Sequence, residues 1–222
     1  RHNFCNDLDD DVFNLWTVFM HRKDELIEKV ELMPVSDSLF QHWRKNKETD
    51  PILKAVRFLM LSNFGYMGKT ETLALTVDKS KSALIKNMLY NFKDVKFICE
   101  DFRKVLPKLS MNLDEQRPFI YNDPPYLSTT DTYTNSFTEQ DTSDLFDVCL
   151  NSGYNFAISE LKHPFVLELV KSHNEILKDK GKRELEVIEI GERQSLKKRD
   201  TEILIVNYES PALYSLFRNG HK

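Results

Sequence analysis

The run Asp123-Pro124-Pro125-Tyr126 contains the residue types needed to hold an amino group and make it reactive. An exocyclic amino group on a base is a weak nucleophile because its lone pair is delocalised into the ring. The Asp123 carboxylate can accept one N–H and the Pro124 carbonyl the other, since prolines fix φ and lack a backbone donor. Tyr126 offers a flat face for base stacking, worth roughly 1–3 kcal/mol. The chemistry that suits this set is methyl transfer to such an amine.

An ordinary turn is the alternative reading of this tetrapeptide, because Asp followed by two prolines is a common loop signal. The apolar run 119–121 immediately before it predicts a buried strand that ends at the loop. Ligands of open α/β sheets bind beyond the carboxyl ends of the strands. The position therefore favours a functional loop.

Strand-like and helix-like apolar patterns alternate along the chain, which predicts an α/β sheet. Strands are expected at 2–6, 95–99, 119–121, 154–159, 185–190 and 201–208, the last two as an antiparallel pair. Helices are expected after the N-cap candidates Asp9 to Asp11, Ser36, Asp50 and Thr138, the last of these helices ending at Gly153. Further helices are expected near 26–30, 80–92, 102–109 and 163–178, and a loop at 62–78.

The net charge of −4 is unevenly distributed along the 222 residues. Residues 41–104 carry 13 Lys and Arg against 7 Asp and Glu, a surplus of 6. Such a basic segment is typical of a surface that faces DNA. The alternative is that these side chains only solvate helices, which leaves the regional bias unexplained.

Four segments give the chain a family resemblance. From about His2 to Tyr208 it resembles DNA adenine-N6 methyltransferases of the Dam type. The resemblance implies a Rossmann-like class I methyltransferase sheet with a small helical DNA-recognition insertion. The catalytic domain would comprise 1–35 and 94–222, and the target-recognition insertion 36–93. The segments are Asn6-Asp7-Leu8-Asp9, Cys99-Glu100-Asp101-Phe102, Asn122-Asp123-Pro124-Pro125-Tyr126 and Thr134-Asn135-Ser136-Phe137-Thr138.

The same resemblance implies S-adenosyl-L-methionine as cofactor. Asp7 would bind its ribose hydroxyls, Asp101 its adenine amino group, and Phe102 would pack on the adenine ring. Asp123 would take part both in catalysis and in cofactor binding. The alternatives are a helix cap for Asp7, which Asp9 or Asp11 could equally provide, and a plain core aromatic for Phe102.

Double-stranded DNA is the partner that the resemblance implies, with the target adenine flipped out of the duplex. A cognate restriction endonuclease is a candidate partner, and no obligate protein partner is evident. Residues 133–138 and 197–199 are two further segments that could contact DNA. The alternative for 133–138 is a helix N-cap by Thr138, and the alternative for 197–199 is a solvated hairpin tip. The candidate DNA contacts are Arg57, Asn63, Lys69, Thr70, Thr72, Asn135, Ser136, Lys197 and Lys198.

One departure from the family concerns glycine. The Gly-rich Phe-x-Gly-x-Gly loop expected before the ribose-binding acid, and an earlier Gly-Lys segment, are absent from this chain. We expect an N-terminal segment to be missing from the chain. The alternatives are a degenerate gene fragment and a second polypeptide that supplies the loop. A chain starting at Arg1 would bind the cofactor weakly and have little or no activity.

Several classes of protein are excluded by composition. No apolar run is long enough to span a membrane, and the six histidines form no cluster with metal-ligand spacing. The scattered Cys5, Cys99 and Cys149 indicate reduced core residues of a cytoplasmic protein, encoded by a bacterium or a phage. Two rival functions stay open: methylation of cytosine N4, RNA guanine N2 or a protein amide, and DNA binding by a cofactor-deficient remnant.

Overall fold

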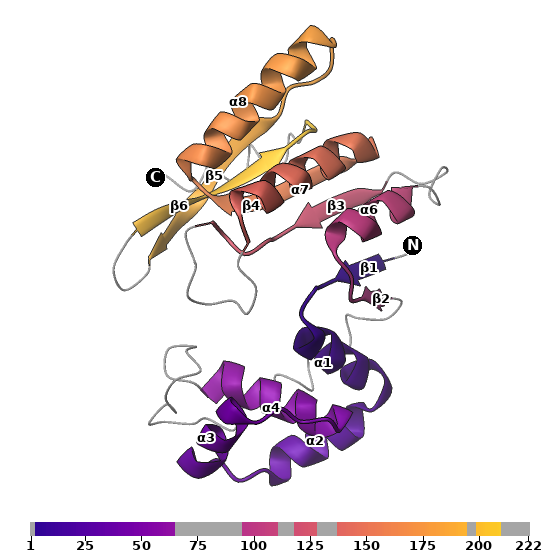
Figure 1. Ribbon diagram of the computed structural model, residues 1–222, viewed down its shortest axis with the longest axis vertical. Helices are drawn as coiled ribbons and strands as arrows, with labels where there is room; N and C mark the ends of the chain where they lie inside the picture. The colour runs from indigo at the N-terminus through magenta and orange to yellow at the C-terminus, as the bar shows by residue number, and fades with distance from the viewer. Residues whose placement is uncertain (1–2, 65–94, 111–117, 128–136, 195–198, 210–222) are drawn as a thin grey trace. The chain divides into compact units, whose positions relative to one another are not determined.

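The computed structural model describes residues 3–64, 95–110, 118–127, 137–194 and 199–209 (Figure 1). The chain divides into two compact units, Arg1–Phe102 and Arg103–Lys222, which are described separately below. Helices and strands occur in both units, so the predicted α/β class is confirmed at that level. No helix of the described residues is both long and apolar enough to cross a membrane.

The first unit contains a small parallel sheet. Its two strands, β1 (Asn3–Asn6) and β2 (Val95–Ile98), pair in register from Asn3 opposite Val95 to Asn6 opposite Ile98. Both strands were predicted at these positions. The indole of Trp16 stacks on the Phe97 ring at 5.6 Å between centroids, so the sheet is packed against the helix that follows β1.

Four helices make up the rest of this unit: α1 (Asp10–His21), α2 (Lys23–Leu32), α3 (Asp37–Lys45) and α4 (Pro51–Phe64). Three begin at a predicted cap. Asp9 accepts from the Asp11 N–H at 2.8 Å, Ser36 from Leu39 at 3.2 Å, and Asp50 from Leu53 at 2.9 Å. These caps satisfy N–H groups that have no partner inside the helix.

The four helices share one hydrophobic core. Side chains of α1 and α2 pack together with side chains of α3 and α4. Figure 1 shows these four helices grouped together. Burial of one common apolar surface explains why α1 and α2 join α3 and α4. The core residues are Val18, Phe19, Leu26, Met33, Phe40, Trp43, Ile52, Ala55, Val56, Met60 and Leu61.

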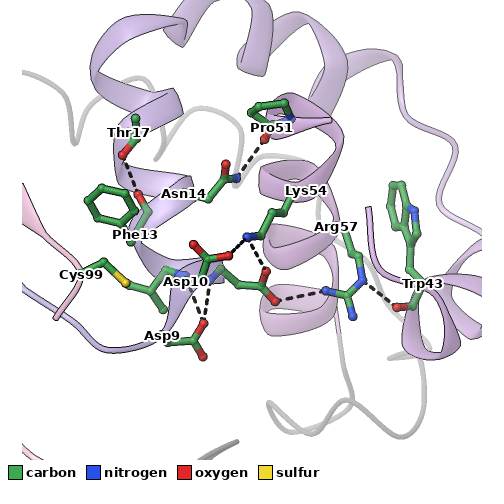
Figure 2. Close-up of polar contacts among 12 residues, drawn as sticks. Asp9, Asp10, Phe13, Asn14, Thr17, Trp43, Pro51, Lys54, Arg57 and Cys99 are labelled. Carbon is green, nitrogen blue, oxygen red and sulfur yellow. Dashed lines mark hydrogen bonds and ion pairs between the residues drawn. The ribbon is translucent and has the colours of Figure 1, made fainter. Parts of the chain in front are cut away.

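Polar contacts also join α1 to α4, as Figure 2 shows. The Lys54 ammonium pairs with the Asp10 carboxylate and lies 3.4 Å from Asp11 Oδ1. The Asn14 amide donates to the Pro51 carbonyl at 2.9 Å. A loop was expected from residue 62, but α4 continues to Phe64. The rest of that loop and the helix expected at 80–92 lie outside the described residues.

The second unit contains a four-stranded sheet in the order β3-β4-β6-β5. Strand β3 (Phe119–Asn122) runs parallel to β4 (Asn155–Leu161). Strand β6 (Arg199–Val206) is antiparallel to both β4 and β5 (Glu186–Gln194), which confirms the predicted closing pair. Strand β4 runs two residues further than predicted and ends with the buried residues Glu160 and Leu161.

Three helices accompany this sheet: α6 (Phe102–Ser110), α7 (Glu139–Ser152) and α8 (Pro164–Asp179). Thr138 caps α7, as predicted, in a reciprocal capping box with Asp141. Gly153 ends α7 with φ at 73°, a left-handed conformation that favours glycine. The fully buried Phe146 of α7 and Phe156 of β4 contribute to the core.

Candidate active site

The Asp123–Tyr126 loop begins where β3 ends. The last pair of the parallel β3–β4 ladder is Asn122 opposite Ile158, so the loop lies at the carboxyl end of β3, beside the last residues of β4. Asp123 is exposed, while Pro124 and Pro125 are half-buried. The loop thus presents one accessible carboxylate at the edge of the sheet where ligands of such sheets bind.

Tyr126 is anchored to two strands by its hydroxyl group. The phenol oxygen lies 2.9 Å from Ser159 Oγ on β4 and donates to Glu202 Oε1 on β6 at 2.6 Å. Burial, followed by the hydrogen bond to Glu202, raises the pKa of this phenol well above its ordinary value. The side chain is 8% exposed and stays neutral, so the sheet fixes its position.

Three residues around the loop were missed by the sequence analysis: Ser159, Glu160 and Glu202. Burial raises the pKa of the Glu160 carboxyl to about 7, and the nearby Asp123 charge adds to this effect. Glu160 is a charged residue inside the predominantly apolar sequence of β4, and that is the signal that could have identified it; Glu202 follows three polar residues in β6 and has no such signal. Together these residues form the polar surroundings of the loop.

The candidate cofactor acids Asp7 and Asp101 follow neighbouring parallel strands of the first unit. The Asp7 N–H continues the ladder to the Ile98 carbonyl at 3.2 Å, and the Asn6 amide donates to the Glu100 carbonyl at 2.9 Å. Helix α1 is capped by Asp9, so the capping role considered for Asp7 is filled by another residue. Asp7 instead accepts the Asp9 N–H at 2.8 Å, and burial raises its pKa above the ordinary value.

Phe102 is half-buried and begins α6, directly after Asp101. The position fits either of the roles considered for it, an adenine-packing ring or a core aromatic. The assignment of Asp7, Asp101 and Phe102 to a cofactor stays a prediction.

Arg103 links α6 to the start of α7. Its guanidinium donates to Asp141 Oδ1 at 2.5 Å and to Asp144 Oδ2 at 2.7 Å. Asp141 also accepts the backbone N–H of Thr138 at 2.8 Å. Burial opposes ionisation of Asp141, but the hydrogen bonds from Thr138 and Arg103 prevail and lower its pKa. Thr138, the last residue of the candidate segment 133–138, is therefore held by Asp141, which Arg103 holds in turn.

Arg57, expected to contact DNA, occupies a packing position instead. Its side chain is buried, and the Nε group donates to the carbonyl oxygen of Trp43 at 2.8 Å, as Figure 2 shows. The same group donates to the Asn46 carbonyl at 2.9 Å. Nη1 lies 3.3 Å from Asp11 Oδ2. A guanidinium committed to these acceptors inside the helical core is not available for a phosphate, so we withdraw this candidate.

The other DNA candidates divide into one described residue and several that lie outside the described ranges. Asn63 is exposed near the end of α4, where its amide donates to the Leu59 carbonyl at 3.0 Å. Within the described residues, no group of three or more His, Cys, Asp and Glu side chains could hold a metal ion. The candidates outside the described ranges are Lys69, Thr70, Thr72, Asn135, Ser136, Lys197 and Lys198.

A mixed α/β fold with an Asp-Pro-Pro-Tyr loop at the carboxyl end of a strand is typical of methyltransferases that act on amino groups. The chain belongs to the family of D12 class N6 adenine-specific DNA methyltransferases, whose model matches residues 2–185. This confirms the resemblance drawn from the sequence.

Two curated relatives carry the name DNA adenine methylase, one from Escherichia coli strain K12 and one from Escherichia coli O157:H7. Each is 27% identical to this chain over 164 residues, an alignment that covers 64% of this chain. The alignment spans 57% of the length of these relatives. What their names say of adenine methylation is therefore carried to this chain only as a proposal.

Proposed function

We propose that this protein transfers a methyl group from S-adenosylmethionine to N6 of adenine in duplex DNA. The observation that carries the proposal is the anchored Asp123–Tyr126 loop at the carboxyl end of β3 in a chain of this family. We further propose that the two sheets belong to one Rossmann-like methyltransferase domain, and that a helical lobe, residues 36–93, recognises the target.

In this proposal the loop binds the amino group of the flipped base. The exposed Asp123 carboxylate accepts one N–H and the Pro124 carbonyl accepts the other, so that the lone pair is localised on nitrogen. The ring of Tyr126 supports the base by stacking. The amine loses its proton after it has become positively charged, so Asp123 acts as an acceptor that orients the amine. Positioning of the reacting groups is the main source of rate.

Asp7, Asp101 and Phe102 are the residues proposed to hold S-adenosylmethionine, which supplies an electrophilic methyl group on a sulfonium. The chemistry of the set fits that group. Two carboxylates at the ends of neighbouring parallel strands can accept from hydroxyl and amino groups, and the aromatic ring after them can pack on a base. The carboxyl edge of β1 and β2 is where such sheets bind nucleotides.

Duplex DNA is the proposed partner, with Asn63 as the described candidate for a contact in the helical lobe. The proposed contacts outside the described ranges are Lys69, Thr70, Asn135, Ser136, Lys197 and Lys198. By resemblance, a restriction endonuclease with the same target sequence is a candidate functional partner.

The test is a methyl-transfer assay with labelled S-adenosylmethionine and, as separate acceptors, duplex DNA, RNA and protein, comparing the wild type with Asp123→Ala. Asp179→Ala, at the exposed C-terminal end of α8, is the matched control. We expect label in N6-methyladenine from the wild type and the control, and at least about a hundredfold loss of rate in Asp123→Ala. Label in cytosine, RNA or protein amides instead of adenine would refute the proposal. Cofactor binding without transfer to any acceptor would favour a non-enzymatic DNA-binding role.

A further inference from the structure

Arg103 is the second residue of α6, and its side chain binds the first two turns of α7. Nη2 donates to Asp141 Oδ1 at 2.5 Å, and Nε donates to Asp144 Oδ2 at 2.7 Å. The two carboxylates are three positions apart, so they lie on the same side of α7 and face one guanidinium together. Charge-assisted hydrogen bonds from two nitrogens of a planar group fix its orientation as well as its distance.

Both carboxylates are oriented by their own helix. The second oxygen of Asp141 accepts the backbone N–H of Thr138 at 2.8 Å and its hydroxyl group at 2.6 Å. The second oxygen of Asp144 accepts the Gln140 amide at 2.7 Å. The hydrogen bonds from Gln140 and Arg103 lower the pKa of the Asp144 carboxyl, so this acceptor is charged in neutral solution. Arg103 thus binds two acceptors whose positions are determined by the start of α7.

Helix α6 needs such an anchor because its own backbone bonding is weak. It has nine residues, Phe102–Ser110, and Pro107 lies inside it. Proline has no N–H, so α6 lacks the bond that a regular helix makes from this position to the Arg103 carbonyl. Short helices draw most of their stability from tertiary contacts. The direction of the first turn of α6, which begins with Phe102, therefore depends on what holds Arg103.

We propose that Arg103 is a positioning residue for the cofactor site. Through Asp141 and Asp144 it fixes the first turn of α6, and that turn carries Phe102, the ring proposed to pack on the adenine of S-adenosylmethionine. Without the guanidinium, α6 loses these two hydrogen bonds to α7, and the repulsion between the two carboxylates is no longer offset by it. The inference rests on the proposed function for the identity of the ligand.

The first test is a double-mutant cycle on S-adenosylmethionine binding, measured by isothermal titration calorimetry. We expect Arg103→Met to raise Kd about fivefold or more in the wild-type background and less than about twofold in Phe102→Ala, where the ring is absent. Arg103→Lys keeps a charged donor without the planar fork, so its Kd should lie between those of the wild type and Arg103→Met. The control is Arg22→Met, which breaks a similar fork with Glu25 of α2 and should leave Kd unchanged.

Two results of this cycle would overturn the inference. One is wild-type affinity in Arg103→Met. The other is an equal rise of Kd with and without the Phe102 ring, as expected if the ion pairs only stabilise the fold. Urea unfolding of each variant verifies that the titrated protein is folded. A failure of the proposed function alone would appear differently, as cofactor binding by the wild type without methyl transfer to adenine.

A second test needs no ligand. Asp144→Ala removes one acceptor of Arg103 and leaves every residue of α6 unchanged. In protein with ¹³C-labelled phenylalanine rings, we expect the Phe102 signals to shift in Asp144→Ala. They should keep their wild-type positions in the control Asp147→Ala, since this α7 carboxylate pairs with His173 instead. Unchanged Phe102 signals in Asp144→Ala would refute the positioning role.

Discussion

The Tyr126 hydroxyl group donates to Glu202 Oε1 at 2.6 Å, which ties the end of the candidate loop to β6, a strand 76 positions away in the sequence. Ser159 on β4 completes the arrangement at 2.9 Å from the same phenol oxygen. A single atom of the loop is thereby fixed by two strands. The loop is held by hydrogen bonds to the sheet as well as by the stiffness of its two prolines.

Replacing Tyr126 by Phe should separate anchoring from stacking. The ring stays, but Glu202 and Ser159 lose a buried partner, so we expect a loss of unfolding free energy of about 1–2 kcal/mol and a fall of a few-fold in kcat. Tyr126→Ala, which also removes the ring, should reduce the rate far more. Tyr121→Phe, at an exposed position of β3, is the control and should change neither quantity. Urea unfolding measures the stability, and steady-state kinetics measure kcat. Equal rates for Tyr126→Phe and Tyr126→Ala would contradict a stacking role.

Replacing Glu160 by Gln should change how stability depends on pH. The folded state holds the proton more tightly than the unfolded chain, because the carboxyl pKa rises from 4.5 to about 7 on folding. The contribution of Glu160 to the free energy of unfolding is fully present below pH 4.5 and is lost as the pH rises through 7. Between about pH 5 and pH 8 the wild type should therefore lose, relative to Glu160→Gln, on the order of 2 kcal/mol of unfolding free energy. Urea titrations at both pH values measure it, and a constant difference between the proteins would disprove it.

Replacing Arg57 by Met should test whether this residue supports the helical core or contacts DNA. The change leaves Asp11 and the carbonyl oxygens of Trp43 and Asn46 without their buried donor. We expect a loss of about 3 kcal/mol in unfolding free energy, against less than about 0.5 kcal/mol for the exposed control Arg44→Met. The salt dependence of DNA binding by folded Arg57→Met should match that of the wild type. A slope of log K against log salt that is lower by about one would instead indicate a phosphate contact.

The predictable parts of this fold are those that local sequence determines. Asp9, Ser36 and Thr138 were identified as caps because a cap needs only its own first helical turn, and Gly153 because few other residues adopt a positive φ. The Asp-Pro-Pro-Tyr loop was identified for the same reason, since its chemistry is contained in four consecutive residues.

The unpredicted parts depend on contacts between distant segments. Glu202 and Ser159 reach Tyr126 only through the order β3-β4-β6 of the sheet. Arg57 was assigned to DNA because it is basic, whereas the carbonyl oxygens that bind it come from the end of α3. The shared core of α1 to α4 was not predicted, because amphipathic patterns show that a helix has an apolar face and do not show which helices share it.

The pairing of β1 with β2 has a consequence for how the chain folds. Asn3 lies opposite Val95, so this small sheet closes only when the ends of a long intervening segment meet, and that closure is entropically costly. The cluster of α1 to α4 forms from contacts that are much nearer in sequence and should assemble earlier. The cluster of α1 to α4 would then act as a nucleus that brings the two strands together, and the acids Asp7 and Asp101 would come side by side only in the last steps of folding.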